Sequence, residues 1–266
     1  MKPDAASVTP ALERGIAILE MLTGPLRDGA SRHDIQKRLG IPQASTYRLL
    51  KTLSEARLIS EDASTGKFRL GARSMRLGFW ARHVSPVVKA AQPLLRDLSL
   101  LTHQMSTLIV HDHRWKLMVL ETWQTEGTPL RVAVRPGMFF GLDQSTAPGL
   151  CYLTFEPSLR AEKFLHQISI PERRALMDLQ VEPPDKSILD VCQNFRELGY
   201  AVQTINPGNS GLAVPVYDRR ARTVRVAAAL SIVCDAKFLT PRHVAKWSAA
   251  AQRYARELEE MGPFSE

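Results

Sequence analysis

The clearest pattern of apolar and polar positions lies in residues 31–53, which read as two short helices joined by a tight turn. Ile35 and Leu39 stand four residues apart, as on one face of a first helix that Ser31 can cap. Gly40 suits the left-handed conformation that ends a helix. The pattern therefore predicts a first helix of about two turns, closed at both ends by its own sequence.

The second helix of this hairpin is predicted to have two different faces. Pro42 suits its first turn, where a missing N–H costs nothing. Four residues follow the spacing of a buried stripe: Thr46, Leu49, Leu50 and Leu53. The other side carries small and polar residues: Gln43, Ala44, Tyr47, Arg48 and Lys51. Such a helix can enter the DNA major groove, which is about 12 Å wide, although an ordinary helical hairpin with a solvated polar face has the same pattern.

The residues on either side of the hairpin favour the DNA-binding interpretation. A helix is predicted to begin at Pro10, and residues 58–59 and 68–70 read as two strands around a turn at residues 62–66. Three helices and a small hairpin make a winged helix-turn-helix, in which Lys67 and Arg69 of the wing can reach phosphates or the minor groove.

The remaining two thirds of the chain read as a helical linker followed by an α+β domain. Residues 72–83 form a helix with Met75, Leu77, Phe79 and Trp80 as apolar contacts, and a long helix begins at Pro86, which Pro93 would bend or divide. Strands are expected at residues 106–111, 115–121, 130–134, 200–205, 212–217 and 224–232, with turns or loops at 111–114 and 206–211. Helices are expected at residues 145–153, 159–165, 171–179, 185–198 and 241–261. The predicted domains are 9–71, 72–102 and 103–262, and the sheet is expected to be antiparallel.

Charge supports a polyanion-binding head. The chain of 266 residues has a net charge of +8; residues 1–85 hold 14 Lys and Arg against 8 Asp and Glu, whereas residues 86–266 hold 21 against 19. This excess is typical of a nucleic-acid-binding domain on a near-neutral body, although a solvated surface could also carry it. No apolar run approaches the roughly 20 residues of a membrane span, and the N-terminus has no signal-peptide core, so a cytoplasmic, nucleoid-associated protein is expected.

At this point the order of the elements and several short motifs resemble the isocitrate-lyase-regulator (IclR) family of bacterial transcription regulators. In the head the matching motifs are residues 11–15 (ALERG), 40–50 (GIPQASTYRLL) and 65–71 (TGKFRLG). In the body they are residues 146–149 (TAPG), 198–201 (LGYA), 213–218 (AVPVYD) and 228–231 (AALS). The resemblance covers about residues 9–262. It implies a winged helix-turn-helix, a helical linker and a GAF-like (profilin-like) effector domain with an antiparallel sheet. It also implies dimers or tetramers on palindromic double-stranded DNA, modulated by a small organic acid.

The resemblance also implies site residues. The groove-facing set would be Gln43, Ala44, Ser45, Tyr47 and Arg48, with Arg32, Lys51, Lys67 and Arg69 as basic residues around it. The effector-binding set would be Thr146, Ala147, Gly149, Gln203, Gly211, Ser231 and Val233. Because Pro148 removes one N–H donor from the helix start, either Ala147, Gly149 and their neighbours hold the carboxylate or the ligand sits differently. Further candidates are Arg131 and Arg135 for a second carboxylate, and Trp115, Trp123, Phe139 and Phe140 for an aromatic ring, although each also suits an ordinary structural role.

Other function classes have less support in the sequence. A GAF-like small-molecule-binding enzyme, or a redox sensor using Cys234, would leave the winged head as a protein-interaction module. Cys151 and Cys192 fit buried thiols, and His111 and His113 have no third residue spaced to complete a metal site. We therefore expect a DNA-binding regulator without catalytic residues, cofactor or metal.

Overall fold

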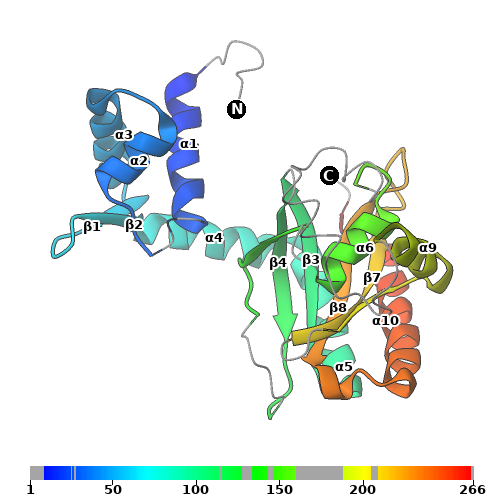
Figure 1. Ribbon diagram of the computed structural model, residues 1–266. Coiled ribbons are helices and arrows are strands. Elements are labelled where there is room, and N and C mark those ends of the chain that lie inside the picture. Colours follow the sequence, from blue (N-terminus) through cyan, green and yellow to red (C-terminus); the bar gives the residue numbers. More distant parts are fainter. Residues whose placement is uncertain are drawn as a thin grey trace. The chain divides into compact units, whose positions relative to one another are not determined.

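The computed structural model describes residues 9–24, 26, 28–113, 116–127, 134–142, 146–159, 188–204 and 209–264. The chain divides into two compact units, Met1–Val84 and Ser85–Glu266 (Figure 1). The helical segment predicted at residues 72–102 divides between them, because its first helix belongs to the first unit and its second helix to the second unit.

The first unit is a winged helix-turn-helix. Its elements in chain order are α1 (Pro10–Thr23), α2 (Arg32–Leu39), α3 (Gln43–Glu55), β1 (Ile59–Asp62), β2 (Lys67–Leu70) and α4 (Ala72–Val84). One small apolar core joins the three helices to the hairpin: Ile18, Leu22, Ala30, Ile35, Leu50, Leu53, Ile59 and Phe68. A single β-bridge from Ala30 to Phe68 ties the segment before α2 to the wing. The predicted head is confirmed.

Helix α4 differs from the expectation for its apolar residues. No residue of α4 is buried. Met75, Leu77, Phe79 and Trp80 were expected as apolar contacts, but their side chains are between 55% and 79% exposed. The prediction of a helix is therefore confirmed, whereas its apolar residues are not buried in the head or elsewhere among the described residues.

The second unit is built on one antiparallel sheet. Its strands are β3 (Met105–His113), β4 (Lys116–Trp123), β5 (Phe139–Gly141), β6 (Ala201–Gln203), β7 (Asn209–Tyr217) and β8 (Val226–Asp235), in the spatial order β5-β4-β3-β8-β7-β6. The helices are α5 (Pro86–Thr102), α6 (Ala147–Phe155), α9 (Ile188–Leu198), α10 (Pro241–Met261) and the short 3₁₀ helix η1 (Ala236–Phe238).

Helices cover both faces of this sheet (Figure 1). On one face, α6 and α9 pack on alternate strand residues, including Ile109, Val119, Ala213 and Ala229. On the other face, α5 and α10 pack on the intervening residues of the same strands, including Leu108, Leu212, Leu230 and Ile232. The alternation follows from the two-residue period of a strand. It makes a three-layer α+β domain and confirms the predicted fold class.

Helix α5 continues through Pro93, which is exposed, so of the two expected effects, bending or dividing the helix, division does not occur. Two other local predictions for this unit are wrong. Strand β3 runs to His113, which pairs with Lys116, so residues 111–113 are strand and not turn. Residues 209–211 were expected in a loop, but they begin β7 and pair with β8. Strand β5 was not predicted. Most or all of three predicted elements lies outside the described residues: the helices at 159–165 and 171–179 and the strand at 130–134.

Candidate nucleic-acid interface and ligand-binding site

Both ends of α2 are fixed by side-chain and backbone capping. The Ser31 hydroxyl accepts a hydrogen bond from the Asp34 N–H (3.2 Å), and the Asp34 carboxylate accepts one from the Ser31 N–H (3.0 Å). The Ser31 hydroxyl also donates to the Asp34 carboxylate (2.6 Å), and this bond, together with the one from the Ser31 N–H, holds the pKa of Asp34 below its usual value. Gly40 ends the helix at φ 63°, and its N–H donates to the Gln36 carbonyl (2.9 Å). The turn before α3 therefore has one well-defined path.

Helix α3 separates a buried face from an exposed one. Thr46, Leu50 and Leu53 are buried in the head, and the Thr46 hydroxyl donates to the Pro42 carbonyl (3.3 Å). Pro42 itself stands just before the helix, not in its first turn. The residues expected to face a groove are exposed, except Ser45, which is half-buried: Gln43, Ala44, Tyr47, Arg48 and Lys51.

A cation–π contact joins the two helices on this exposed side. The guanidinium of Arg32, the first residue of α2, lies 5.3 Å from the centre of the Tyr47 ring. Lys51 pairs with Glu55 one turn later on α3 (3.8 Å). Both side chains of that pair are well exposed, so the pair stabilises little and leaves the ammonium group available to a phosphate.

The wing is a two-stranded hairpin with an ordered tip. The Asp62 carboxylate accepts hydrogen bonds from the Ser64 N–H (3.0 Å) and hydroxyl (2.6 Å), which hold its pKa below the usual value. Arg69 forms an ion pair with the same carboxylate (3.4 Å). Lys67 is exposed and begins β2. The structure thus assigns Arg69 a partner in the wing, whereas Lys67 has no ion pair with the described residues.

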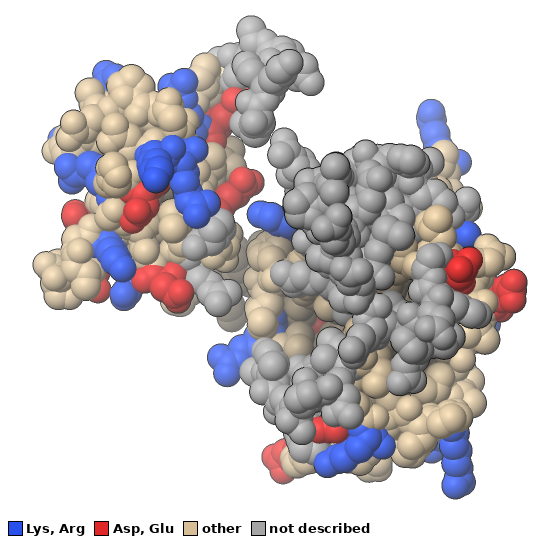
Figure 2. Space-filling view, in the orientation of Figure 1, with Lys and Arg blue, Asp and Glu red and all other residues tan. Residues whose placement is uncertain are grey.

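Basic side chains are spread over the face of the first unit seen in Figure 2, with acidic side chains among them. The Lys and Arg residues of the first unit thus stand at separate positions, on α2, α3 and the wing and also on α4. Separate positions of this kind suit contacts to successive phosphates of a nucleic-acid backbone.

In the second unit, the strand pairing gathers four of the predicted effector residues on one sheet face. Gln203 pairs with Gly211, which pairs with Val233. In the adjacent row, Ala213 pairs with Ser231, which pairs with Thr107 of β3. This is the face that α6 covers. Gly211 has to be glycine, because a Cβ atom there would lie 2.4 Å from the Ile232 carbonyl oxygen.

Two buried hydroxyls on this face have no hydrogen-bond partner among the described residues. They belong to Ser231 (1% exposed) and Thr107 (0% exposed), which are direct cross-strand neighbours. An unsatisfied buried polar group costs about 1–3 kcal/mol, so this pair favours a polar ligand or water above it. Sequence reasoning missed Thr107, although a threonine among the apolar residues of a buried strand was a usable signal.

The start of α6 offers fewer donors than expected. Thr146 caps the helix, and its hydroxyl accepts a hydrogen bond from the Gly149 N–H (3.1 Å). Pro148 has no N–H, and the Leu150 N–H donates to the Thr146 carbonyl (2.9 Å). The Gly149 N–H is therefore already used in the helix cap, and the Ala147 N–H is the other donor of this first turn.

The other effector candidates are scattered. Arg131 and Trp115 lie outside the described residues. Arg135, Trp123 and Phe139 are exposed, whereas Phe140 packs against the core under α6. Only Phe140 of the described aromatic candidates thus contributes to the face on which the predicted site lies.

Comparison with known proteins decides the family. The family model described as "IclR helix-turn-helix domain" matches residues 11–63, and that described as "Bacterial transcriptional regulator IclR C-terminal" matches residues 81–260. The chain belongs to the IclR family. It is a transcriptional regulator with a DNA-binding helix-turn-helix domain.

Relatives of this IclR regulator match over nearly its whole length. The glycerol operon regulatory protein of Streptomyces coelicolor is 28% identical over 256 residues, covering 93% of this chain and 96% of that protein. An IclR regulator from Alicyclobacillus acidocaldarius has the same fold, with a TM-score of 0.77, 22% identity, and coverage of 97% and 100%. An IclR homologue from Microbacterium hydrocarbonoxydans, complexed with 4-hydroxybenzoate, has a TM-score of 0.61 at 20% identity, with coverage of 94% and 99%.

The cysteines of this IclR regulator are unsuited to redox sensing. Cys151, Cys192 and Cys234 are all buried, which argues against the alternative of a redox sensor that uses Cys234. Burial raises the pKa of the Cys151 thiol well above its usual range and that of Cys234 to about 12. Across the described residues, no group of three or more His, Cys, Asp or Glu side chains is placed to hold a metal ion. Within the same ranges, every helix is too short or too polar to cross a lipid bilayer.

Proposed function

We propose that this IclR regulator reads a palindromic operator as a homodimer or tetramer, and that a small organic acid bound under α6 changes its affinity for DNA. The observation that carries the DNA proposal is the division of α3 into a buried face and an exposed face. Thr46, Leu50 and Leu53 hold the helix in the head, while Tyr47 and Arg48 are left to reach base edges or phosphates.

The ligand proposal is supported by the Ser231 and Thr107 hydroxyls, which are buried, adjacent and unsatisfied among the described residues. Gln203, Gly211 and Val233 continue the same face, and Thr146 and Ala147 stand at the start of the helix above the sheet. A homologue of the same fold is complexed with 4-hydroxybenzoate, a hydroxylated aromatic acid, which makes this ligand class the first to test.

The oligomer proposal is supported by the exposed apolar side of α4. Met75, Phe79, Trp80 and Val84 recur at helical spacing and are each at least 56% exposed. Two heads on half-sites one helical turn apart, about 34 Å, need a fixed separation. One residue, Ser85, separates the end of α4 from the start of α5, so a ligand that shifts α5 changes the position of the head.

The DNA proposal is tested by titrating the full chain against the DNA beside its own gene at rising salt. Arg48→Ala is expected to weaken binding by about 10-fold or more, because it removes a base or phosphate contact. If Arg48 contacts a phosphate, the slope of log K against log salt falls by about one. Arg96→Ala removes the same charge from an exposed position of α5 and should change neither the DNA affinity nor its salt dependence. Equal behaviour of both variants would show that α3 is not the recognition helix.

The ligand proposal is tested by the change in operator affinity that 4-hydroxybenzoate and other small aromatic and aliphatic acids produce. Ser231→Leu replaces the buried hydroxyl by a larger apolar side chain and should abolish the response while leaving ligand-free DNA binding intact. Ser231→Ala removes the hydroxyl alone and should weaken the response. Ile232→Leu, on the opposite sheet face, is the control. An unchanged response in both Ser231 variants would place the ligand elsewhere.

A further inference from the structure

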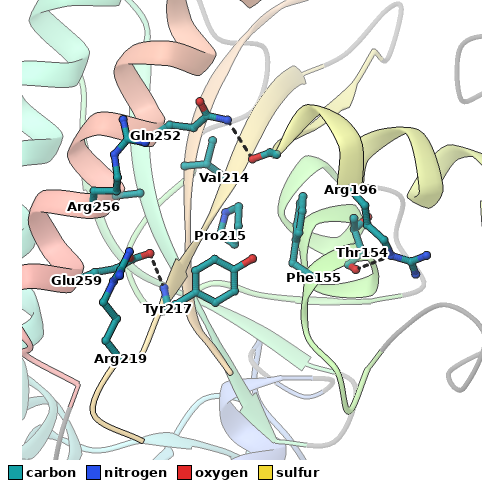
Figure 3. Close-up of a pocket in the computed structure, with 12 residues that line it drawn as sticks. Thr154, Phe155, Arg196, Val214, Pro215, Tyr217, Arg219, Gln252, Arg256 and Glu259 are labelled. Atoms are coloured by element: carbon teal, nitrogen blue, oxygen red, sulfur yellow. Dashed lines mark hydrogen bonds and ion pairs between the residues drawn. The ribbon is translucent and has the colours of Figure 1, made fainter. Parts of the chain in front are cut away.

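The groove at the β7 edge of the second unit, of about 550 Å³, engages several of its polar groups within its own chain (Figure 3). The Tyr217 N–H donates to the buried Glu259 carboxylate of α10 (2.9 Å). The Gln252 amide donates to the Leu198 and Gly199 carbonyls at the end of α9 (both 3.3 Å). Contacts within the chain account for these groups, so they give no reason to expect a ligand in this groove.

In the first unit, by contrast, the position of Arg32 is not explained by the helix that carries it. Arg32 is the first residue of α2, where the positive end of the helix dipole disfavours a basic side chain. Its guanidinium lies 5.3 Å from the centre of the Tyr47 ring on α3. A guanidinium over an aromatic ring is favourable, so this contact between the two helices offsets the unfavourable position.

The charge of Arg32 is not used in an ion pair among the described residues. Asp34, the one acidic residue of α2, accepts hydrogen bonds from the Ser31 hydroxyl (2.6 Å) and N–H (3.0 Å) instead. Arg32 is exposed, so the edge of its guanidinium remains open to a phosphate oxygen. Because the guanidinium is planar, it can contact the ring with its face and a phosphate with its edge.

Tyr47 occupies the middle of the exposed side of α3. Gln43 stands one turn before it and Lys51 one turn after it, at the four-residue spacing of one helix face. The Tyr47 side chain is 50% exposed, although Thr46 and Leu50 beside it are buried in the head. A helix that enters the major groove along this face therefore brings an aromatic ring to the bases.

The contact with Arg32 restricts the direction of that ring. A side chain that is already oriented in the free protein loses less conformational freedom when it binds. Arg32 is thus a positioning residue for Tyr47, in addition to any contact of its own with a phosphate.

The chemistry of the ring selects one group of the major groove. Base edges there present N–H donors, nitrogen and oxygen acceptors, and one apolar group, the 5-methyl of thymine. The carbon surface of an aromatic ring suits that methyl group. Gln43 on the preceding turn suits the neighbouring polar edges, since an amide can both donate and accept.

We propose that Arg32 and Tyr47 together recognise one thymine in each half-site of the operator. The Tyr47 ring packs on the thymine 5-methyl group, while Arg32 holds the ring in place and binds a phosphate nearby. The inference rests on the proposed function, because it needs α3 in the major groove. It extends that function by naming a base and by giving Arg32 a part in sequence recognition.

The test replaces the thymines of the operator one at a time by uracil, which removes only the methyl group. The operator is the shortest fragment of the DNA beside the gene that the full chain binds more tightly than random DNA. At one thymine in each half-site, the replacement is expected to weaken wild-type binding by about fivefold or more. Tyr47→Phe keeps the ring and should keep this loss, whereas Tyr47→Ala should show none.

Two variants of Arg32 separate positioning from charge. Arg32→Lys keeps the positive charge without the planar group, so it should keep the salt dependence of binding but lose most of the effect of uracil. Arg32→Gln should lose both. Arg38→Gln, at another exposed position of α2, is the matched control and should keep the full effect of uracil. Binding is measured at low salt, where weakened variants still bind, and thermal unfolding checks that each variant is folded.

The outcomes that would overturn the inference differ from those that would overturn the proposed function. If no uracil weakens wild-type binding, or if the same uracil weakens Tyr47→Ala equally, Tyr47 does not contact a thymine methyl. If Arg32→Lys keeps the full effect of uracil, Arg32 does not position the ring. Both results leave operator binding intact. A wild type that binds no fragment more tightly than random DNA would overturn the proposed function and this inference with it.

Discussion

Single residues set the geometry of the head through very local interactions. Ser31 and Asp34 exchange hydrogen bonds across three residues, and Gly40 supplies the left-handed backbone that ends α2. Arg32 then reaches across to the Tyr47 ring. Each of these contacts contributes little free energy. Because the partners are close in sequence or on adjacent helices, together they fix where α3 begins. The direction of the recognition helix is thus determined one residue at a time.

Ser31→Ala is expected to destabilise α2 by about 1 kcal/mol, the usual cost of losing an N-cap. Hydrogen exchange of the α2 amides measures this as a loss of protection of about fivefold. Ser60→Ala, at an exposed position of β1, serves as the control and should leave α2 unchanged. Equal protection in the two variants would show that the capping box does not stabilise this helix.

The same cap should depend on pH. The hydrogen bonds from Ser31 lower the pKa of Asp34 in the folded chain, so the ionised carboxylate stabilises α2 above the pKa of the unfolded state. That contribution is lost as the pH falls through the lower folded value. The difference in α2 protection between the wild type and Asp34→Asn should therefore shrink below about pH 4.

Whole elements show where sequence patterns are sufficient and where they are not. The period of Thr46, Leu50 and Leu53 identified the buried side of α3, because the helix packs on neighbours in its own short head. The proline in α5 was a misleading signal. Pro93 has no N–H to donate to the Lys89 carbonyl, but both residues face solvent. Ala91, Leu94 and Leu95 are buried and hold the helix together.

Helix α4 makes a prediction at this scale. Trp80→Glu places a charge in the exposed apolar side that we assign to self-association, and it should weaken that association by 10-fold or more in sedimentation equilibrium. Ala81→Glu places the same charge about 100° farther round the helix and should weaken association less. A wild type that stays monomeric at micromolar concentration, or equal behaviour of the two variants, would contradict a role for α4 in the oligomer.

At the scale of the whole molecule, two units divide the proposed work. The first unit holds α3 and the wing, whereas the second holds the proposed effector site under α6. The second unit has two apolar cores, one on each side of a shared sheet. Such a domain can bind a ligand on one face of the sheet while the apolar core on the other face, with α5 and α10, keeps the domain folded.

Interactions close along the chain explain what the sequence determined by itself. Caps, turn residues and helical periods predicted the head, its wing, the linker helix and α10, because each depends on residues only a few positions apart. The family resemblance rested on the same short motifs. Buried positions such as Cys151 and Cys192 were also predicted correctly from their apolar neighbours.

Tertiary structure decided everything that depends on pairing between distant strands. The strand order β5-β4-β3-β8-β7-β6 places Ser231 beside Thr107. Pairing with β8 also makes residues 209–211 part of a strand, although their sequence is typical of a turn. A local pattern contains no information about which strand lies beside which, because backbone pairing is compatible with almost any side chain. The head was therefore predictable from sequence, whereas the proposed effector site required the fold.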